Sequence, residues 1–424
     1  TINWGDGQSQ TVSASTTAAT TFTSHTYATP GTYSITDTAN LTTGGTASAT
    51  TSTTTNASDF TPIAPQRIMD TRTGTGGVQG YLYGGNCYGL QVAGVDGIPS
   101  GATAVSVNLT ATNTVGNGLF VLGSGNASNL NYNGGQTVAN SAIVPLNGGV
   151  LPVCVNGNAG TYADAIVDVT GYFAQTAGDG YQPSAPERIL DTRAGTGAAK
   201  AKVGAKSSLS VPIVGVDSIP ADATAVAVHV TETNATGGGF IAAEPDGSGV
   251  PSTSSLNFGS GQTVSNTVIV PIAADGKIEL YNGAAGGSVD LIADVSGYYS
   301  ASAPEVFMPV TPYRAVDTRT TNNKIASFSS ERFDLVPAAT QIPTGATMAA
   351  NLTATDETAG GSLIAYSPKY ATPNTSALNF GKGQNVAGFG LFDTLTGTDS
   401  IDVYDNSPGS TDLVIDVFGY FTAN

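Results

Sequence analysis

Short stretches in which apolar and polar residues alternate recur along most of the chain, with glycine-rich turns between them. Residues 104–110, 225–231 and 348–353 alternate with a period of two, which is typical of β-strands that bury one face. Turn signals recur every ~10 residues, as in β-sandwiches and small barrels. No stretch has a convincing helical period. We therefore predict an all-β chain with less than about a tenth of its residues in helices, against a norm of about a third.

Two phrases occur three times in the same order. An arginine phrase opens each repeat, with its first arginine at Arg67, Arg188 and Arg314, and an acidic phrase closes the repeat about a hundred residues later. A period of about 120 residues suits one compact domain and is too long for a solenoid unit. The predicted architecture is a row of tandem β-sandwich domains: an N-terminal segment at 1–58, then homologous repeats at 60–175, 181–300 and 307–424.

The N-terminal segment contains Trp4-Gly-Asp-Gly7, then His25-Thr-Tyr27, then Pro30-Gly-x-Tyr33. This order resembles the second half of a PKD-type immunoglobulin-like domain, over roughly residues 2–50. The resemblance implies two further strands before Ile2. We expect either that the segment is a fragment of such a domain or that a strand from a neighbouring chain completes it. The Thr/Ser-rich tract at 46–58 is predicted to be a last strand that runs into a linker.

The repeats carry a second resemblance. Repeat 1 opens with Arg67-Ile-Met-Asp-Thr-Arg72 and closes with Asp168-Val-x-Gly-Tyr-Phe173, and the other two repeats have close variants. These phrases are similar to those of secreted multi-repeat proteins of actinobacteria and related soil bacteria. The resemblance covers residues 60–424 and implies a cell-surface or extracellular setting, without implying an activity.

Charged residues are scarce. They make up 11% of the chain, and the formal charge of -17 arises mainly because lysine and arginine together number only 14. A deficit of cations argues against nucleic acid and anionic membrane surfaces as partners. No apolar run is long enough to cross a bilayer, so no membrane insertion is expected. Any secretion signal is expected upstream of Thr1 or already removed.

The arginine and acidic phrases allow two interpretations. Paired carboxylates can hydrolyse glycosides, whereas the five donors of an arginine are suited to locking two carboxylates in place. Three copies on one chain favour the structural interpretation. Strict alternation would put Asp70 and Arg72 on one face of their strand and Arg67 on the other. We predict structural ion pairs among Arg67, Asp70, Arg72, Asp164, Asp168, Arg188, Asp191, Arg193, Asp290, Asp294, Arg314, Asp317, Arg319, Asp412 and Asp416.

Other catalytic or metal-binding sets are hard to assemble. The only histidines are His25 and His229, which is too few for a convincing Ser-His-Asp or zinc set. No catalytic residue is predicted, and the chain is expected not to be an enzyme. Calcium is the one cofactor worth considering, because oxygen ligands abound, although EF-hand spacing is absent. Its candidate ligands are Asp6, Asp37, Asp96 and Asp217.

Both cysteines, Cys87 and Cys154, fall in repeat 1. Two cysteines in one domain of a secreted protein usually pair. We predict a disulfide, which would stabilise the domain by up to roughly 4 kcal/mol in the chain-entropy model.

The loop after each arginine phrase differs most between repeats. In repeat 1 it carries Tyr81, Tyr83, Asn86 and Tyr88. These side chains could stack on and hydrogen-bond to sugar rings, or the tyrosines could pack on their own sandwich.

The predicted function is that of a non-enzymatic extracellular structural or adhesive protein: a stalk, an adhesin or a surface-fibre subunit. Its partners would be further copies of the chain in a fibre, or cell-surface glycans. One alternative is a carbohydrate-binding module of a cell-wall or polysaccharide-acting protein. Others are a phage fibre and, less favoured, a hydrolase with a paired-carboxylate site.

Overall fold

The chain folds almost entirely into β-strands. A computed structural model describes residues 1–12, 23, 25, 27, 31–40, 44–55, 57–125, 127–176, 178–337 and 342–423. Strands account for 58% of the chain and helix for 1%, which confirms the predicted all-β class. Among the described residues, the helix is one short turn, α1 (Thr318–Thr321). Thr26 and Pro30 of the PKD-like pattern lie outside the described residues.

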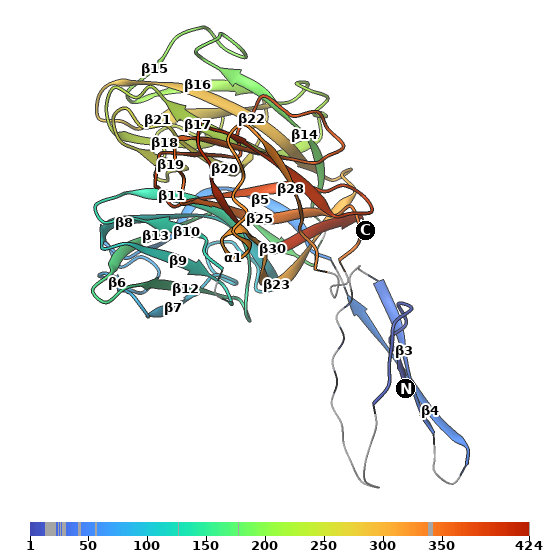
Figure 1. Ribbon diagram of the computed structural model, residues 1–424. Helices are drawn as coiled ribbons and strands as arrows, with labels where there is room; N and C mark the ends of the chain where they lie inside the picture. The colour runs from blue at the N-terminus through green and yellow to red at the C-terminus, as the bar shows by residue number, and fades with distance from the viewer. Residues whose placement is uncertain are drawn as a thin grey trace.

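The N-terminal segment forms a small antiparallel sheet of its own in the order β2-β1-β3-β4. Its two long strands extend away from the rest of the molecule (Figure 1). The Tyr27 hydroxyl donates to the carbonyl of Trp4 at 2.8 Å, and both aromatic residues are buried. The strands are β1 (Ile2–Asn3), β2 (Ser9–Gln10), β3 (Gly31–Asn40) and β4 (Thr46–Thr55).

Repeat 1 is a sandwich of two antiparallel sheets. The inner sheet, in the order β11-β8-β13-β5, carries the arginine phrase on β5 and the closing phrase on β13, and β6 also pairs with β13. The outer sheet has the order β10-β9-β12-β7. The strands are β5 (Asp59–Asp70), β6 (Leu82–Tyr83), β7 (Cys87–Gln91), β8 (Ala102–Val115), β9 (Gly118–Leu122), β10 (Leu130–Tyr132), β11 (Val138–Pro145), β12 (Val150–Gly157) and β13 (Tyr162–Ala174).

Repeat 2 has the same topology. Its inner sheet is β20-β17-β22-β14, with β15 on β22, and its outer sheet is β16-β21-β18-β19. The strands are β14 (Gly180–Asp191), β15 (Val203–Gly204), β16 (Ser207–Pro212), β17 (Ala223–Thr233), β18 (Gly239–Pro245), β19 (Leu256–Phe258), β20 (Val264–Pro271), β21 (Lys277–Asn282) and β22 (Ser288–Ser300).

Repeat 3 repeats the arrangement, with an inner sheet β23-β30-β25-β28 and an outer sheet β24-β29-β26-β27. Each of the three sandwiches has its own apolar core between its two sheets. The strands of repeat 3 are β23 (Glu305–Asp317), β24 (Ser330–Asp334), β25 (Thr347–Thr355), β26 (Gly361–Tyr366), β27 (Leu378–Phe380), β28 (Val386–Asp393), β29 (Ser400–Asn406) and β30 (Asp412–Ala423).

The three repeats also join one another through their first strands. Backbone pairing links Phe60 of β5 to Asp179, Tyr181 of β14 to Glu305, and Phe307 of β23 to Ser58. The contacts close a cycle, so the repeats surround a common axis in an approximate threefold arrangement. We call this three-repeat unit the body.

A fourth apolar core lies on that axis and contains residues of all three repeats. Six aromatic rings form a closed cycle in it, in which the first-strand ring of each repeat alternates with the ring that ends a closing phrase. Neighbouring ring centroids are 4.4–5.1 Å apart, close to the preferred range for aromatic pairs. In order around the cycle, the rings are Phe60, Phe173, Phe307, Phe421, Tyr181 and Tyr299.

The repeated glycine of the closing phrase has a packing reason. A Cβ at Gly171 would overlap the ring of Phe60, and a Cβ at Gly419 would overlap the ring of Phe307. The glycine therefore lets each first-strand ring lie directly on the closing strand and reach the central core.

Candidate functional site

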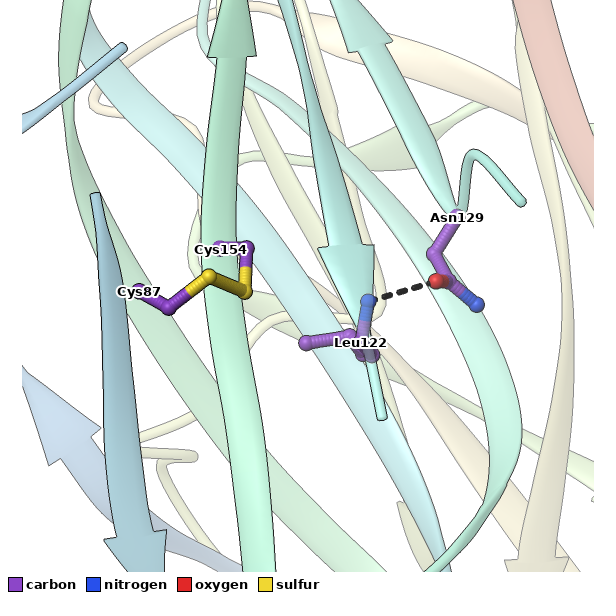
Figure 2. The surroundings of a disulfide bond; sticks show 4 residues. All are labelled: Cys87, Leu122, Asn129 and Cys154. Atoms are coloured by element: carbon purple, nitrogen blue, oxygen red, sulfur yellow. Dashed lines mark hydrogen bonds between the residues drawn. A yellow bond between two sulfur atoms is a disulfide. The ribbon is translucent and has the colours of Figure 1, made fainter. Parts of the chain in front are cut away.

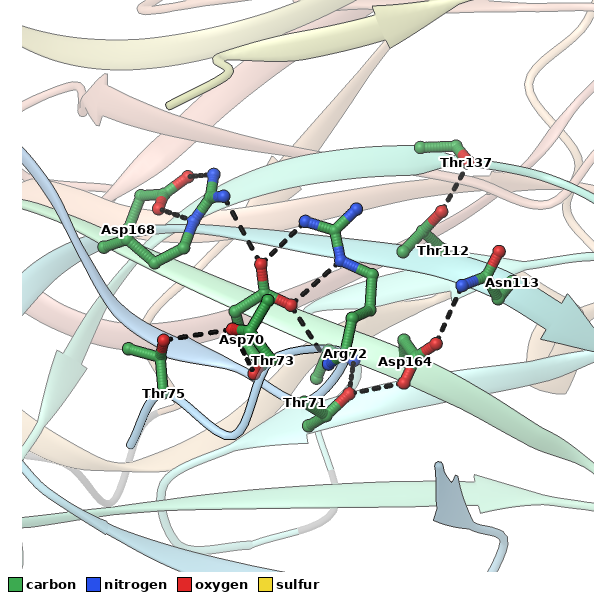
Figure 3. Close-up of polar contacts among 12 residues, drawn as sticks. Asp70, Thr71, Arg72, Thr73, Thr75, Thr112, Asn113, Thr137, Asp164 and Asp168 are labelled. Carbon is green, nitrogen blue, oxygen red and sulfur yellow. Dashed lines mark hydrogen bonds and ion pairs between the residues drawn. The ribbon is translucent and has the colours of Figure 1, made fainter. Parts of the chain in front are cut away.

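The arginine phrase of repeat 1 forms a compact ion-pair network (Figure 3). Arg67 Nε lies 2.9 Å from Asp168 Oδ1 of the closing strand, and Arg67 Nη1 lies 3.4 Å from Asp70 Oδ2. Arg72 holds Asp70 from the other side, with Nε at 2.9 Å from Oδ1 and Nη2 at 2.7 Å from Oδ2. The network therefore ties the first strand of the repeat to the last.

The same network recurs in the other two repeats. Arg188 Nε is 2.8 Å from Asp294 Oδ1, and Arg314 Nε is 3.0 Å from Asp416 Oδ1. The second arginine of each phrase again clamps the phrase's own aspartate, Arg193 on Asp191 at 2.7 Å and Arg319 on Asp317 at 2.6 Å. All six phrase arginines are thus paired within their own repeat.

The expected separation of Arg67 from Asp70 and Arg72 on opposite faces is wrong. Met69 pairs with Val167 and Arg67 with Asp168, so Ile68 is an extra residue in the ladder. Such a β-bulge shifts the alternation by one position. As a result, Arg67 and Asp70 come to lie on the same side. The ladders of the other two repeats shift at the equivalent position.

The first aspartate of each closing phrase has a different partner from the one predicted. Asp164 accepts a hydrogen bond from the Thr71 hydroxyl at 2.6 Å and one from Asn113 Nδ2 at 2.8 Å. The threonine oxygen in turn accepts from the backbone N–H of Ala165 at 3.1 Å. Asp290 with Thr192, and Asp412 with Thr318, repeat the contact. The threonine of the arginine phrase therefore connects the two phrases. This residue was not identified from the sequence.

The two carboxylates on Arg67 experience opposite electrostatic effects. Hydrogen bonds from Arg72 lower the pKa of Asp70. Burial raises the pKa of Asp168, although Arg67 acts in the opposite direction. Carboxylates with diverging pKa values can form an acid–base pair. Here, however, both oxygens of Asp168 accept hydrogen bonds from the Arg67 guanidinium, which covers the carboxylate that would have to act on a substrate.

The loop after the arginine phrase of repeat 1 carries exposed aromatic rings. Tyr81 is 43% exposed and Tyr83 51% exposed, and both contact Tyr162 of β13, with centroids 4.6 and 5.5 Å apart. Val115, which is 41% exposed, pairs with Tyr162 in the neighbouring strand. We call Tyr81, Tyr83, Tyr162 and Val115 the aromatic platform. Sequence reasoning missed Tyr162, because only the strand pairing of Tyr83 with Tyr162 brings it to the loop.

The other two candidate ligand residues of this loop differ from each other. The Tyr88 ring packs on the core of repeat 1, and its hydroxyl donates to the carbonyl of Gly76 at 2.7 Å. The Asn86 side chain is exposed, and its backbone carbonyl accepts a hydrogen bond from the N–H of Val155 at 3.0 Å. Of the four predicted residues, Tyr81, Tyr83 and Asn86 are thus accessible to a ligand, whereas Tyr88 supports the loop.

The predicted disulfide is confirmed. Cys87 on β7 and Cys154 on β12 lie opposite each other in the outer sheet and are bonded (Figure 2). Cys87 directly follows Asn86, so the disulfide fixes one end of the loop that bears the tyrosines.

The four candidate calcium ligands lie in separate places. Asp6 Oδ2 is 2.7 Å from His25 Nε2, and Asp37 is 3.8 Å from the amino group of Thr1. Asp96 and Asp217 occupy turns of different repeats, with φ of 49° and 47°. Within the described ranges, no group of three or more His, Cys, Asp or Glu side chains is arranged to hold a metal ion. Calcium binding by these residues stays a hypothesis.

No helix in the described part of the chain is long and apolar enough to cross a membrane.

Comparison with known proteins adds little. No protein-family model and no curated protein matches the chain. One solved structure, the M60 catalytic domain with the CBM51-1 and CBM51-2 domains from Clostridium perfringens ZmpB, matches 94% of this chain at 8% identity. The match covers 42% of that protein's length, with a TM-score of 0.16. A TM-score this low carries no argument about fold or function.

Proposed function

We propose that the chain is a non-enzymatic, extracellular adhesive protein whose three-repeat body presents the aromatic platform of repeat 1 to a glycan. The observation that carries the proposal is the exposure of Tyr81 and Tyr83 beside Tyr162, on a loop anchored by a disulfide. Exposed apolar side chains that gather in one patch mark ligand-binding or protein-interaction sites, whereas single exposed ones need no explanation. Tyrosine rings offer flat apolar faces together with a polar hydroxyl, which suits sugar rings.

The non-enzymatic part of the proposal is supported by the use of the charged residues. The repeated arginines and aspartates satisfy one another within each repeat, and the same geometry occurs three times. An ion-pair network that joins the first strand to the last strand in every repeat is what we expect of residues that stabilise the fold. The disulfide supports the extracellular setting, because such bonds persist in oxidising compartments.

Binding to polysaccharides tests the glycan proposal. Affinity electrophoresis and pull-down against insoluble chitin, cellulose and purified bacterial peptidoglycan should find at least one ligand. Replacing Tyr81 and Tyr83 together by Ala should weaken its binding at least tenfold while leaving the melting temperature nearly unchanged. Phe328→Ala is the matched control, because Phe328 is an exposed ring of repeat 3 at 58% exposure. Equal loss in the control, or full binding by the double variant, would contradict the proposal.

A second candidate function, self-association into a fibre, is favoured by the edge of β4. This ten-residue strand pairs with β3 on one side, contains no charged residue and lies at the end of the sheet order. Long uncharged edges are templates for pairing with another strand. We expect Ser48→Lys with Ser52→Lys to reduce any association seen by analytical ultracentrifugation. Ser48→Asn with Ser52→Asn is the matched control, because asparagine leaves the strand edge uncharged. Unchanged association would place the contact elsewhere.

A further inference from the structure

Buried carboxamides join the body at two of its three repeat interfaces. Between repeats 1 and 2, Asn108 Nδ2 donates to the carbonyl of Ser254, and Asn266 Nδ2 donates to Asn108 Oδ1 at 2.9 Å. Between repeats 3 and 1, Asn351 Nδ2 donates to the carbonyl of Ser128 at 2.7 Å, and Asn140 Nδ2 donates to Asn351 Oδ1 at 2.9 Å. In both places a carboxamide supplies one donor and one acceptor.

The third interface, between repeats 2 and 3, lacks this pair. Strand registers place His229 where the other repeats have Asn108 and Asn351, and Gly388 where they have Asn140 and Asn266. His229 Nδ1 lies 2.9 Å from Thr267 Oγ1. Its Nε2 is buried and has no hydrogen-bond partner among the residues that the structure describes. An orphaned buried polar atom is unusual and needs an explanation.

A cavity lies beside His229. It holds about 40 Å³, is partly open to solvent, and is lined by His229, Thr267 and Asp294 of repeat 2 and by Ser376, Gly390 and Phe392 of repeat 3, among others. Ser376 is the counterpart of Ser254 and Ser128, whose carbonyls accept from the asparagines in the other interfaces. This volume is the space open to the centre of a water-sized sphere, and one water needs about 10–15 Å³ of it, so the cavity has room for a group the size of about three waters.

Repeat 3 has glycines at two positions of this interface, and neighbouring side chains take up the room beside them. A Cβ at Gly390 would overlap the ring of Phe392, and a Cβ at Gly388 would overlap Leu378. Gly390 pairs with Ala350, and the same register position holds Ala142 in repeat 1 and Val268 in repeat 2. Glycine at 388 also lacks the carboxamide whose Nδ2, in Asn266 and Asn140, donates to the neighbouring repeat at the other two interfaces.

The surroundings of the cavity favour an uncharged occupant. Asp294 is paired with Arg188 at 2.8 Å, so these two charges offset each other. Burial and the nearby Arg188 lower the pKa of His229 to about 4, which leaves its imidazole neutral at pH 7. A neutral imidazole with one nitrogen engaged offers the other as a single donor or acceptor.

We propose that this cavity at the interface of repeats 2 and 3 binds a small neutral amide, which bridges His229 Nε2 and the backbone carbonyl of Ser376. The ligand's C=O and N–H take the places of the asparagine carboxamides that fill the two equivalent interfaces. The site is independent of the aromatic platform, which lies on repeat 1.

Acetamide is the probe for this site. The chain has only two histidines, so ¹⁵N-histidine labelling yields separate signals for His229 and for His25, which is bonded to Asp6 in the N-terminal sheet. We expect acetamide to shift the His229 ring signals saturably and leave those of His25 unmoved, whereas acetate should do neither. Acetamide should also raise the melting temperature of the full chain.

The matched variant is His229→Asn, which restores the residue found at the other two interfaces. Its carboxamide should bond to Ser376, close the site and abolish the acetamide-dependent rise in melting temperature. Movement of the His229 and His25 signals in parallel, a response that never saturates, or an equal thermal response in His229→Asn would each overturn the proposal. The labelling experiment uses the unmodified chain. It therefore tests the proposal even if the variant does not fold.

Discussion

The residues that occur in all three repeats and the residues that occur in only one lie in different parts of the fold. The recurring arginines, aspartates and aromatic rings lie between the first and last strands or on the central axis, where they contact one another. The platform tyrosines of the loop do not recur: repeats 2 and 3 have Lys202 and Lys324 at the position of Tyr81, and Tyr81 and Tyr83 face solvent. Repetition therefore marks what builds the body, and its absence marks where we expect binding.

The repeat 2–3 interface shows the same rule inside the body. Two interfaces keep the paired asparagines, and the one that departs from them carries both the cavity and the orphaned His229. At this interface, the departure from repetition coincides with an unsatisfied buried nitrogen.

The largest effect is expected from the central core. Phe421→Ala removes a ring that is 1% exposed and contacts rings of repeats 2 and 3. Truncating a buried phenylalanine costs about 3–5 kcal/mol of unfolding free energy. Urea unfolding of the full chain should show this loss, while the control Phe328→Ala, with an exposed ring, should change little. If both variants lost a similar amount of unfolding free energy, the rings of the central core would be no more important for stability than an exposed ring.

A graded effect is expected within the arginine phrase of repeat 2. Arg188→Ala leaves Asp294, whose side chain is 2% exposed, without its partner, and breaking a buried pair in this way costs about 3–5 kcal/mol. Arg193→Ala should cost less, because its side chain is 43% exposed and Asp191 keeps Arg188 at 3.8 Å. Lysine at 188 should rescue poorly, since it lacks the planar fork.

Arg332 is the matched control for this comparison. It lies outside the phrases and pairs with Asp402 at 2.7 Å on an exposed surface. Arg332→Ala should leave the midpoint of unfolding nearly unchanged. If Arg332→Ala lowered the free energy of unfolding as much as Arg188→Ala, the arginines of the phrase would be no more important for stability than an arginine outside it.

The smallest effect concerns a buried carboxyl at a position where the other two repeats have alanine. Glu232 stands where the other repeats have Ala111 and Ala354, and burial raises its pKa to about 8. The folded state therefore keeps the proton while the unfolded state releases it near the usual glutamate pKa of about 4.3. Stability from this group is full below that value and is lost as the pH rises toward 8.

Glu232→Gln removes the titration without changing the shape of the side chain. The drop in melting temperature between pH 5 and pH 8 should be smaller in this variant than in the wild type. Parallel pH profiles for the two proteins would show that Glu232 does not titrate between folded and unfolded states in this range.

Local patterns were enough to predict the all-β class and the Cys87–Cys154 bond. Alternation and turn spacing are local properties, and two cysteines in one domain leave few pairings. The bulge at Ile68 was not predictable from alternation, because an extra residue in a ladder depends on the partner strand. The same holds for Tyr162, which reaches Tyr81 and Tyr83 through strand pairing, and for the ring cycle, whose members are far apart in sequence.

Scanning calorimetry of the full chain tests most directly whether the recurring residues build one body. Because six rings from three repeats share one core, we predict that the repeats unfold in a single transition whose calorimetric and van't Hoff enthalpies agree. Phe421→Ala should move that whole transition to lower temperature. Three separate transitions, of which Phe421→Ala moves only one, would show that the repeats are independent domains and would contradict the account.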